Sequence, residues 1–233
     1  MCIRDRNYLK GLYDAIKTGS KSEREILVTG SARLEYYRYG GDSLQGRYHL
    51  LRLLPLSYLE LNGKGQKTVK DLFLYGGFPE PFFLQSEVET RRWSREYRSK
   101  VVREEVRDLE QVQDLASIEL LSNKLPDHVG GVFSVNSLRE DLQVAHKTAE
   151  KWVQILERMY LVFRVPPFGN PKIRAVKKEQ KIYFYDWTAV LDEANRFENL
   201  VALHLLKYVY WKQDSEGDDL DLRFFRDSDG GEV

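Results

Sequence analysis

The sequence lacks most of the features that mark specialised classes of protein. It has a single cysteine, Cys2, among 233 residues, which excludes an internal disulfide framework and a zinc site built on cysteines. No apolar run approaches the roughly 20 residues of a membrane-spanning helix. The first ten residues also lack the hydrophobic segment of a signal peptide. We therefore expect a cytoplasmic protein with no membrane partner.

An excess of charge of either sign is also absent. Lys plus Arg and Asp plus Glu each number 36, so the net charge does not favour nucleic acid, membranes or acidic substrates, and any such preference must be local. The four histidines have no metal-ligand spacing, and we predict no metal site. They are His49, His128, His146 and His204.

A phosphate-binding loop is missing as well. Gly41 to Tyr48 has the required glycine spacing, but Arg47 and Tyr48 stand where such a loop needs Lys and Ser or Thr. No apolar strand ends in the Asp-Glu or Asp-Asp pair that would hold magnesium. We therefore expect that this chain alone neither binds nucleotide tightly nor hydrolyses ATP.

The N-terminal part nevertheless has an α/β pattern. Apolar residues from Tyr8 to Lys17 recur at helical spacing, and a loop then leads to a short buried strand, Ile26 to Val28. This strand runs into Thr29-Gly30-Ser31, and polar groups at the carboxyl end of a parallel strand are typical of ligand sites. The next apolar run predicts a second strand that stops at Pro55.

The middle of the chain predicts a charged connector followed by two short helices. Mixed charges from Glu87 to Leu115 indicate one long solvated helix. A helix capped by Ser134 or Asn136, a turn at residues 143–145, a helix from Lys147 to Met159 and an apolar strand from Tyr160 to Val165 are typical of a winged helix-turn-helix. Beyond them, the sequence predicts an alternating strand from Lys181 to Asp186, a helix from Phe197 to Val209 and a strand at residues 222–227.

Basic residues of this region predict a DNA-binding face. Those at the start of the second helix occupy the position of base and phosphate contacts in helix-turn-helix proteins; they are His146, Lys147, Thr148 and Lys151. A basic hairpin arm, the wing, adds Lys172, Arg174, Lys177, Lys178 and Lys181. The alternative is that the winged helix is a structural or protein-interaction element.

Six stretches, taken in chain order, closely resemble the prokaryotic AAA-type ATPases that carry a winged-helix region and a C-terminal domain of unknown function with a restriction-endonuclease-like fold. They are ILVTGSARL, SLQGRYHLLRLLPLSYLEL, LYGGFPEPF, residues 133–168, KIYFYD, and FENLVALHLL with FFRDSDGGEV. The resemblance implies that Thr29 and Ser31 sense the γ-phosphate and that Arg47 is an arginine finger. Arg47 as a structural or surface residue is the alternative.

The resemblance also implies that parts of the family pattern lie outside this sequence. The phosphate loop and the magnesium-binding Asp-Glu would precede the first helix, so ATP and Mg²⁺ are expected as cofactors only of the intact parent. MCIRDR resembles a vector or assembly remnant, and we expect truncation at both ends. Glu198 matches the helical glutamate of the nuclease-like pattern, and Glu232 immediately precedes the place of its second acidic residue. The alternative is that Glu198 is a solvated or capping residue.

These observations predict an α/β fold with four regions. They are part of a P-loop-type parallel sheet (1–62), a helical lid or connector (63–115), a winged helix (116–185) and the start of an α/β nuclease-like domain (186–233). The expected function is an ATPase that couples nucleotide state to double-stranded DNA or a protein partner. It would form homo-oligomers if Arg47 acts across a subunit boundary. The alternative is a nucleotide-independent winged-helix DNA-binding regulator.

Overall fold

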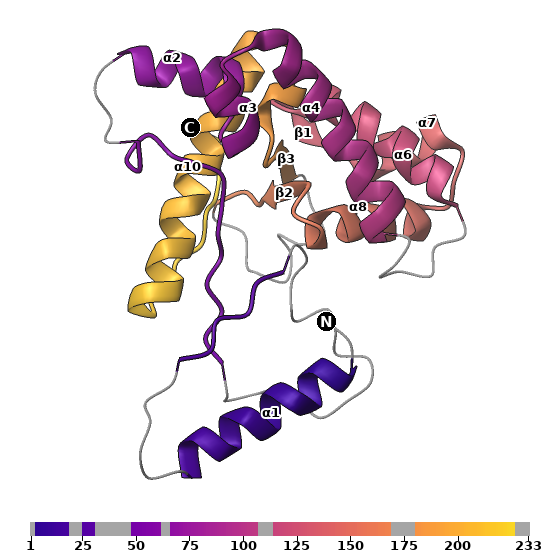
Figure 1. The fold of residues 1–233 in the computed structure, drawn as a ribbon. Coiled ribbons are helices and arrows are strands. Elements are labelled where there is room, and N and C mark those ends of the chain that lie inside the picture. Colours follow the sequence, from indigo (N-terminus) through magenta and orange to yellow (C-terminus); the bar gives the residue numbers. More distant parts are fainter. Residues whose placement is uncertain are drawn as a thin grey trace. The chain divides into compact units, whose positions relative to one another are not determined.

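The computed structural model describes residues 3–18, 25–30, 48–61, 66–106, 114–168 and 180–226 (Figure 1). These residues belong to two compact units, 1–51 and 52–233. The first contains helix α1 (Ile3–Thr18). The elements of the second are α2 (Gln66–Tyr75), α3 (Pro79–Leu84), α4 (Glu87–Lys100), the π-helical turn η2 (Val101–Val106), α6 (Leu115–Lys124), the 3₁₀ turn η3 (Leu125–His128), β1 (Val132–Phe133), α7 (Val135–Leu142), α8 (His146–Arg158), β2 (Val162–Val165), β3 (Gln180–Phe184), the 3₁₀ turn η4 (Trp187–Ala189) and α10 (Glu193–Glu216).

The N-terminal unit confirms the predicted helix but not the predicted strand. Helix α1 includes all of Tyr8 to Lys17. Residues 25–30 form no strand, and the side chain of Leu27 is 84% exposed. A strand requires a hydrogen-bonded neighbour, and the described part of the chain holds no parallel sheet that could supply one. The apolar run before Pro55 is likewise not a strand.

A small antiparallel sheet lies at the centre of the second unit. Its strand order is β1-β3-β2, and β2 pairs with β3 from Val162 opposite Phe184 to Val165 opposite Lys181. The fold is thus a mixture of helices and a small sheet. In Figure 1, α10 lies on one side of this sheet, and α6, α7 and α8 lie on the other.

Helices α7 and α8 and the turn between them confirm the predicted helix pair. Ser134 is the N-cap residue of α7, although its hydroxyl makes no capping hydrogen bond. Gln143 ends this helix with a left-handed backbone, φ 54°, and the Val144 N–H then bonds the Arg139 carbonyl at 3.1 Å. Such a C-terminal motif turns the chain sharply, so only three residues separate α7 from α8.

The core lies between α8, the sheet and the end of α4. Helix α8 buries one face, and its buried residues are Ala149, Trp152, Val153, Ile155 and Leu156. The connector differs from the single long helix that was predicted, because the α-helix ends at Lys100 and continues as the π-helical η2. The side chains of Val101, Val102 and Val106 in η2 are buried, so the end of this connector is a core element.

Helix α10 is longer than the 197–209 helix that was predicted. The Asp192 carboxylate accepts a hydrogen bond from the Asn195 N–H at 2.9 Å and caps its start. Gly217, with φ 76°, ends it. Where a strand was expected after α10, Phe224 forms an isolated parallel bridge with Pro167. Within the described ranges, no helix is both long and apolar enough to span a membrane.

Candidate functional site

The predicted DNA-contacting residues of α8 lie at the exposed start of that helix. His146, Lys147 and Lys151 are exposed, and Thr148 is half-buried. Lys147 and Lys151 are four residues apart and therefore lie on one face of the helix. Neither lysine has an ion pair with any residue in the described parts of the chain. The helix thus presents two unpaired cations to solvent.

Arg164 on β2 pairs with both acidic residues of α8. Its guanidinium donates to Glu150 Oε1 at 3.1 Å and to Glu157 Oε2 at 2.7 Å, and its side chain is only 14% exposed. Burial acts to lower the pKa of Arg164, but the two carboxylates outweigh burial and raise that pKa. Arg164 thereby offsets one of the two negative charges that oppose an anion at α8.

The neighbouring helix α7 carries acidic residues as well. Glu140 and Asp141 are exposed near its end, and Glu140 pairs with Arg139 at 3.5 Å. The positive charge is therefore confined to the start of α8 and does not extend over the whole helix pair.

Five of the predicted site residues lie outside the described residues. They are Ser31, Arg47, Lys177, Lys178 and Glu232, and Lys172 and Arg174 of the predicted wing also lie outside. Thr29 is described and is exposed near the end of residues 25–30. The roles predicted for these residues remain predictions.

Lys181 and Glu198 have a different environment from the one expected. Lys181 was predicted to extend the basic face, but it is buried on β3 and its Nζ donates to Glu198 Oε1 at 2.9 Å. The Tyr183 hydroxyl donates to the same oxygen at 2.7 Å. Glu198, whose side chain is 38% exposed, therefore compensates a buried cation, and its predicted nuclease-like role remains a prediction. Among the described residues, no three His, Cys, Asp or Glu side chains form a metal-binding group.

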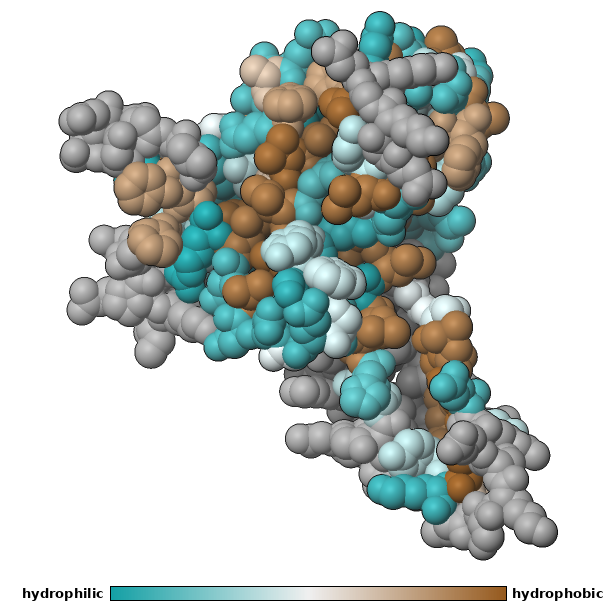
Figure 2. Space-filling model, turned by 90° about the vertical axis from the view of Figure 1, so that its left-hand side faces the viewer, coloured by the Kyte–Doolittle hydropathy of each residue, from teal (hydrophilic) through white to brown (hydrophobic). Residues whose placement is uncertain are grey.

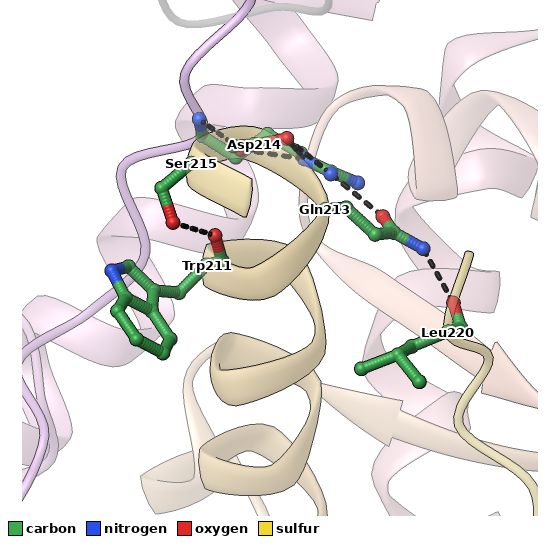
Figure 3. Close-up of polar contacts among 6 residues, drawn as sticks. Trp211, Gln213, Asp214, Ser215 and Leu220 are labelled. Carbon is green, nitrogen blue, oxygen red and sulfur yellow. Dashed lines mark hydrogen bonds and ion pairs between the residues drawn. The ribbon is translucent and has the colours of Figure 1, made fainter. Parts of the chain in front are cut away.

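A second polar region, for which no sequence pattern gave a signal, lies where residues 52–61, here called the strap, run along α10. The Arg52 side chain donates through Nε to Asp214 Oδ1 at 3.1 Å and through Nη2 to Gln213 Oε1 at 2.7 Å. Its guanidinium also lies 3.6 Å from the centre of the Tyr210 ring. Figure 3 shows Gln213 and Asp214 at the end of α10, with Gln213 reaching on to the Leu220 carbonyl.

Two further residues of α10 bind the strap toward the start of the helix. Lys207 Nζ donates to the Pro55 carbonyl at 2.7 Å and pairs with Glu60. His204 Nε2 accepts the Tyr58 N–H at 3.1 Å. From Arg52 to Tyr58, the strap thus meets successively earlier positions of α10, so this part of the strap runs antiparallel to the helix.

An apolar cavity of about 210 Å³ lies beside the strap, between α2 and α10. Its lining residues are Tyr58, Val69, Leu72, Leu200, Val201, His204 and Leu205. Figure 2 views the side of the molecule on which α2 and α10 lie and shows apolar side chains gathered among polar ones. Both ring nitrogens of His204 in this lining are hydrogen-bonded, Nε2 to the Tyr58 N–H and Nδ1 to the Leu200 carbonyl.

A buried polar network joins α4 to the turn after β3. The Asp186 carboxylate accepts hydrogen bonds from the hydroxyls of Ser94 and Thr188. Arg98 Nη1 donates to Ser94 Oγ at 2.9 Å. Burial lowers the pKa of Arg98, an effect that the nearby Asp186 opposes. These contacts fix η4 and α4 against each other and have no open face for a ligand.

Comparisons with known proteins match this chain to a family and to two mycobacterial proteins. Uncharacterized protein Rv2008c of Mycobacterium tuberculosis and uncharacterized protein Mb2031c of Mycobacterium bovis are each 25% identical to it over 178 residues. The aligned region covers 76% of this chain but only 40% of each relative. No solved structure matches the chain. A family model described as Domain of unknown function (DUF8612) matches residues 66–195, which is more than half of the sequence. The chain therefore belongs to the DUF8612 family.

Proposed function

We propose that residues 116–185 are a winged helix-turn-helix that contacts duplex DNA through the start of α8. The order α6, β1, α7, α8, β2, β3, with an antiparallel sheet behind the helix pair, supports this proposal. The observation that carries it is the pair of exposed, unpaired lysines, Lys147 and Lys151, on a helix whose two acidic residues are both paired with Arg164. Exposed cations at this position would bind phosphates.

The wider proposal is that this DNA contact belongs to an AAA-type ATPase. The order of the six sequence motifs supports it, and in it residues 26–28 become a strand only alongside the rest of the nucleotide-binding core. Thr29, Ser31 and Arg47 would then respond to ATP and Mg²⁺ held by segments of the parent protein outside this sequence. An arginine finger that acts across a subunit boundary would make the parent a homo-oligomer.

A nucleotide-independent DNA-binding regulator is the second candidate function. The unpaired lysines support the regulator and the ATPase equally, because both proposals place DNA at the start of α8. The DNA sequence upstream of this chain distinguishes the two candidates. The ATPase requires that it encode a Gly-x4-Gly-Lys-Ser/Thr loop in the same reading frame. Hydrolysis by the extended protein should then fall when Arg47→Ala is introduced, and unchanged turnover would remove Arg47 from the mechanism.

The DNA contact is tested by fluorescence anisotropy with a labelled duplex at several salt concentrations. We expect the chain to bind and the Lys147→Glu/Lys151→Glu variant to bind more weakly, with a salt slope smaller by about 2. Lys70→Glu/Lys100→Glu is the matched control, because both lysines are exposed on other helices. An equal loss in the control, or no binding by the unaltered chain, would refute the proposal.

A further inference from the structure

The hydrogen bonds of His204 fix which of its ring nitrogens carries the proton. Nδ1 lies 2.8 Å from the Leu200 carbonyl oxygen, which can only accept. Nε2 lies 3.1 Å from the Tyr58 nitrogen, whose N–H can only donate. Nδ1 must therefore carry the hydrogen and Nε2 the lone pair. The observed contact between α10 and the strap exists only for neutral His204.

We propose that His204 is a pH-sensitive latch that holds the middle of the strap on α10 while neutral and releases it when protonated. A proton added to the ring goes to Nε2, because Nδ1 already carries one. The new N–H would then face the N–H of Tyr58, and the hydrogen bond would be replaced by a contact between two donors. The strap must move away from the ring to relieve that contact.

The surroundings of His204 determine the pH at which it titrates. Burial lowers its pKa below the ordinary 6.5. Two charged groups face it, Lys207 on the next turn of α10 and Glu60 on the strap, and they act in opposite directions. The Trp187 ring lies 5.9 Å away, while α2 contributes only apolar residues to the adjoining cavity. The latch is thus closed at neutral pH and opens in mild acid.

The part of the strap before Tyr58 has two anchors that do not involve His204, so release is not expected to reach it. Arg52 is held by Asp214 at one end. The Leu56 N–H donates to the Gly77 carbonyl at 2.6 Å. Neither anchor contains a group that titrates near the ordinary pKa of histidine. Opening should therefore expose Tyr58 and the turn that follows it, without unfolding the helix.

The latch is tested on the full chain by NMR, and the test does not depend on ATP or DNA. Long-range ¹H–¹⁵N spectra at about pH 7.5 should show His204 with its hydrogen on Nδ1. Protection of the Tyr58 amide against exchange, corrected for the intrinsic rate, should fall by up to about tenfold per pH unit below about 6.5, until the folded-state pKa is passed. A hydrogen on Nε2, or protection that does not change with pH, would overturn the proposal.

Two variants separate His204 from other titrating groups. His204→Gln keeps an acceptor for the Tyr58 N–H but cannot titrate, so protection of Tyr58 should become independent of pH in this range. His146→Gln, on the exposed start of α8, should leave the pH dependence unchanged. If the pH dependence persists in His204→Gln, the latch is refuted. If that variant does not fold, the His204 tautomer and the pH dependence of Tyr58 protection in the unaltered chain test the proposal.

Discussion

The side-chain amide of Asn199 on α10 hydrogen-bonds both backbone groups of Phe184 on β3. The Phe184 N–H donates to Oδ1 at 2.8 Å, and Nδ2 donates to the Phe184 carbonyl at 2.8 Å. Strand β1 pairs with β3 only at Gln180 and Lys181. The Asn199 amide therefore acts as one more strand residue where β1 has already ended, and it joins α10 to the sheet.

Replacing Asn199 should destabilise the second unit strongly. Asn199 is fully buried, so Asn199→Leu would leave the N–H and C=O of Phe184 without partners. We expect a loss of about 2–4 kcal/mol in the free energy of unfolding, measured by urea denaturation. Asn136→Leu on the exposed face of α7 is the control and should change stability by less than about 0.5 kcal/mol.

Removing Arg164 should weaken both stability and the proposed DNA contact. Arg164→Met leaves the half-buried carboxylates of Glu150 and Glu157 without a cation, which we expect to cost about 1–3 kcal/mol. It also restores negative charge beside Lys147, so duplex affinity should fall at low salt. Adding Glu150→Gln and Glu157→Gln to this variant should recover much of the affinity, and failure to do so would contradict the charge argument.

A methyl group at Gly77 should disturb the strap. A Cβ there would lie 2.7 Å from Trp187 and 2.8 Å from the Leu56 carbonyl oxygen, closer than packed atoms approach. We expect Gly77→Ala to destabilise the chain by about 1–3 kcal/mol and to increase exchange of strap amides. Gly131→Ala is a matched control, because nothing lies within 4 Å of its Cβ position. Similar losses in both variants would contradict this explanation.

The strap should have a second response to acid, distinct from that of His204. Burial acts to raise the pKa of Asp214, but Arg52 outweighs burial and lowers that pKa from 3.8. A carboxyl group with a lowered folded-state pKa stabilises the fold fully above its ordinary pKa, and this stabilisation is lost as pH falls through the lowered value. The urea concentration at the unfolding midpoint should therefore decrease as the pH is lowered below about 4. In Asp214→Asn this decrease should be smaller. In Asp141→Asn it should be unchanged.

Local patterns predicted the helices of the second unit well. The apolar spacing in α7, α8 and α10 placed all three helices, because one buried face leaves a 3.6-residue period in the sequence. The charged connector was less accurate: mixed charges predicted a single helix through Leu115, but the buried valines of η2 carry the chain into the core. Charge periodicity reports the exposed face only and does not indicate where a helix enters a core.

The strand predicted at residues 26–28 shows that composition alone does not determine whether a strand forms. Residues 26–28 have the composition of a buried strand, yet they are exposed and unpaired with any strand in the part of the chain that the structure describes. β-propensity expresses a fit to neighbouring strands, and the residues alone do not supply those neighbours. Strands β2 and β3 formed where predicted because each is the other's partner.

The sequence by itself determined the helix periods, the turn between α7 and α8 and the basic residues at the start of α8, since each depends on residues within a few positions of one another. Only the tertiary structure decided that Arg52 meets Asp214, 162 positions away, that Asn199 extends the sheet, and that Lys181 is buried against Glu198. A side chain's hydrogen-bonding capacity is local information. The identity of its partner depends on how distant segments pack, and no periodic pattern in the sequence records that.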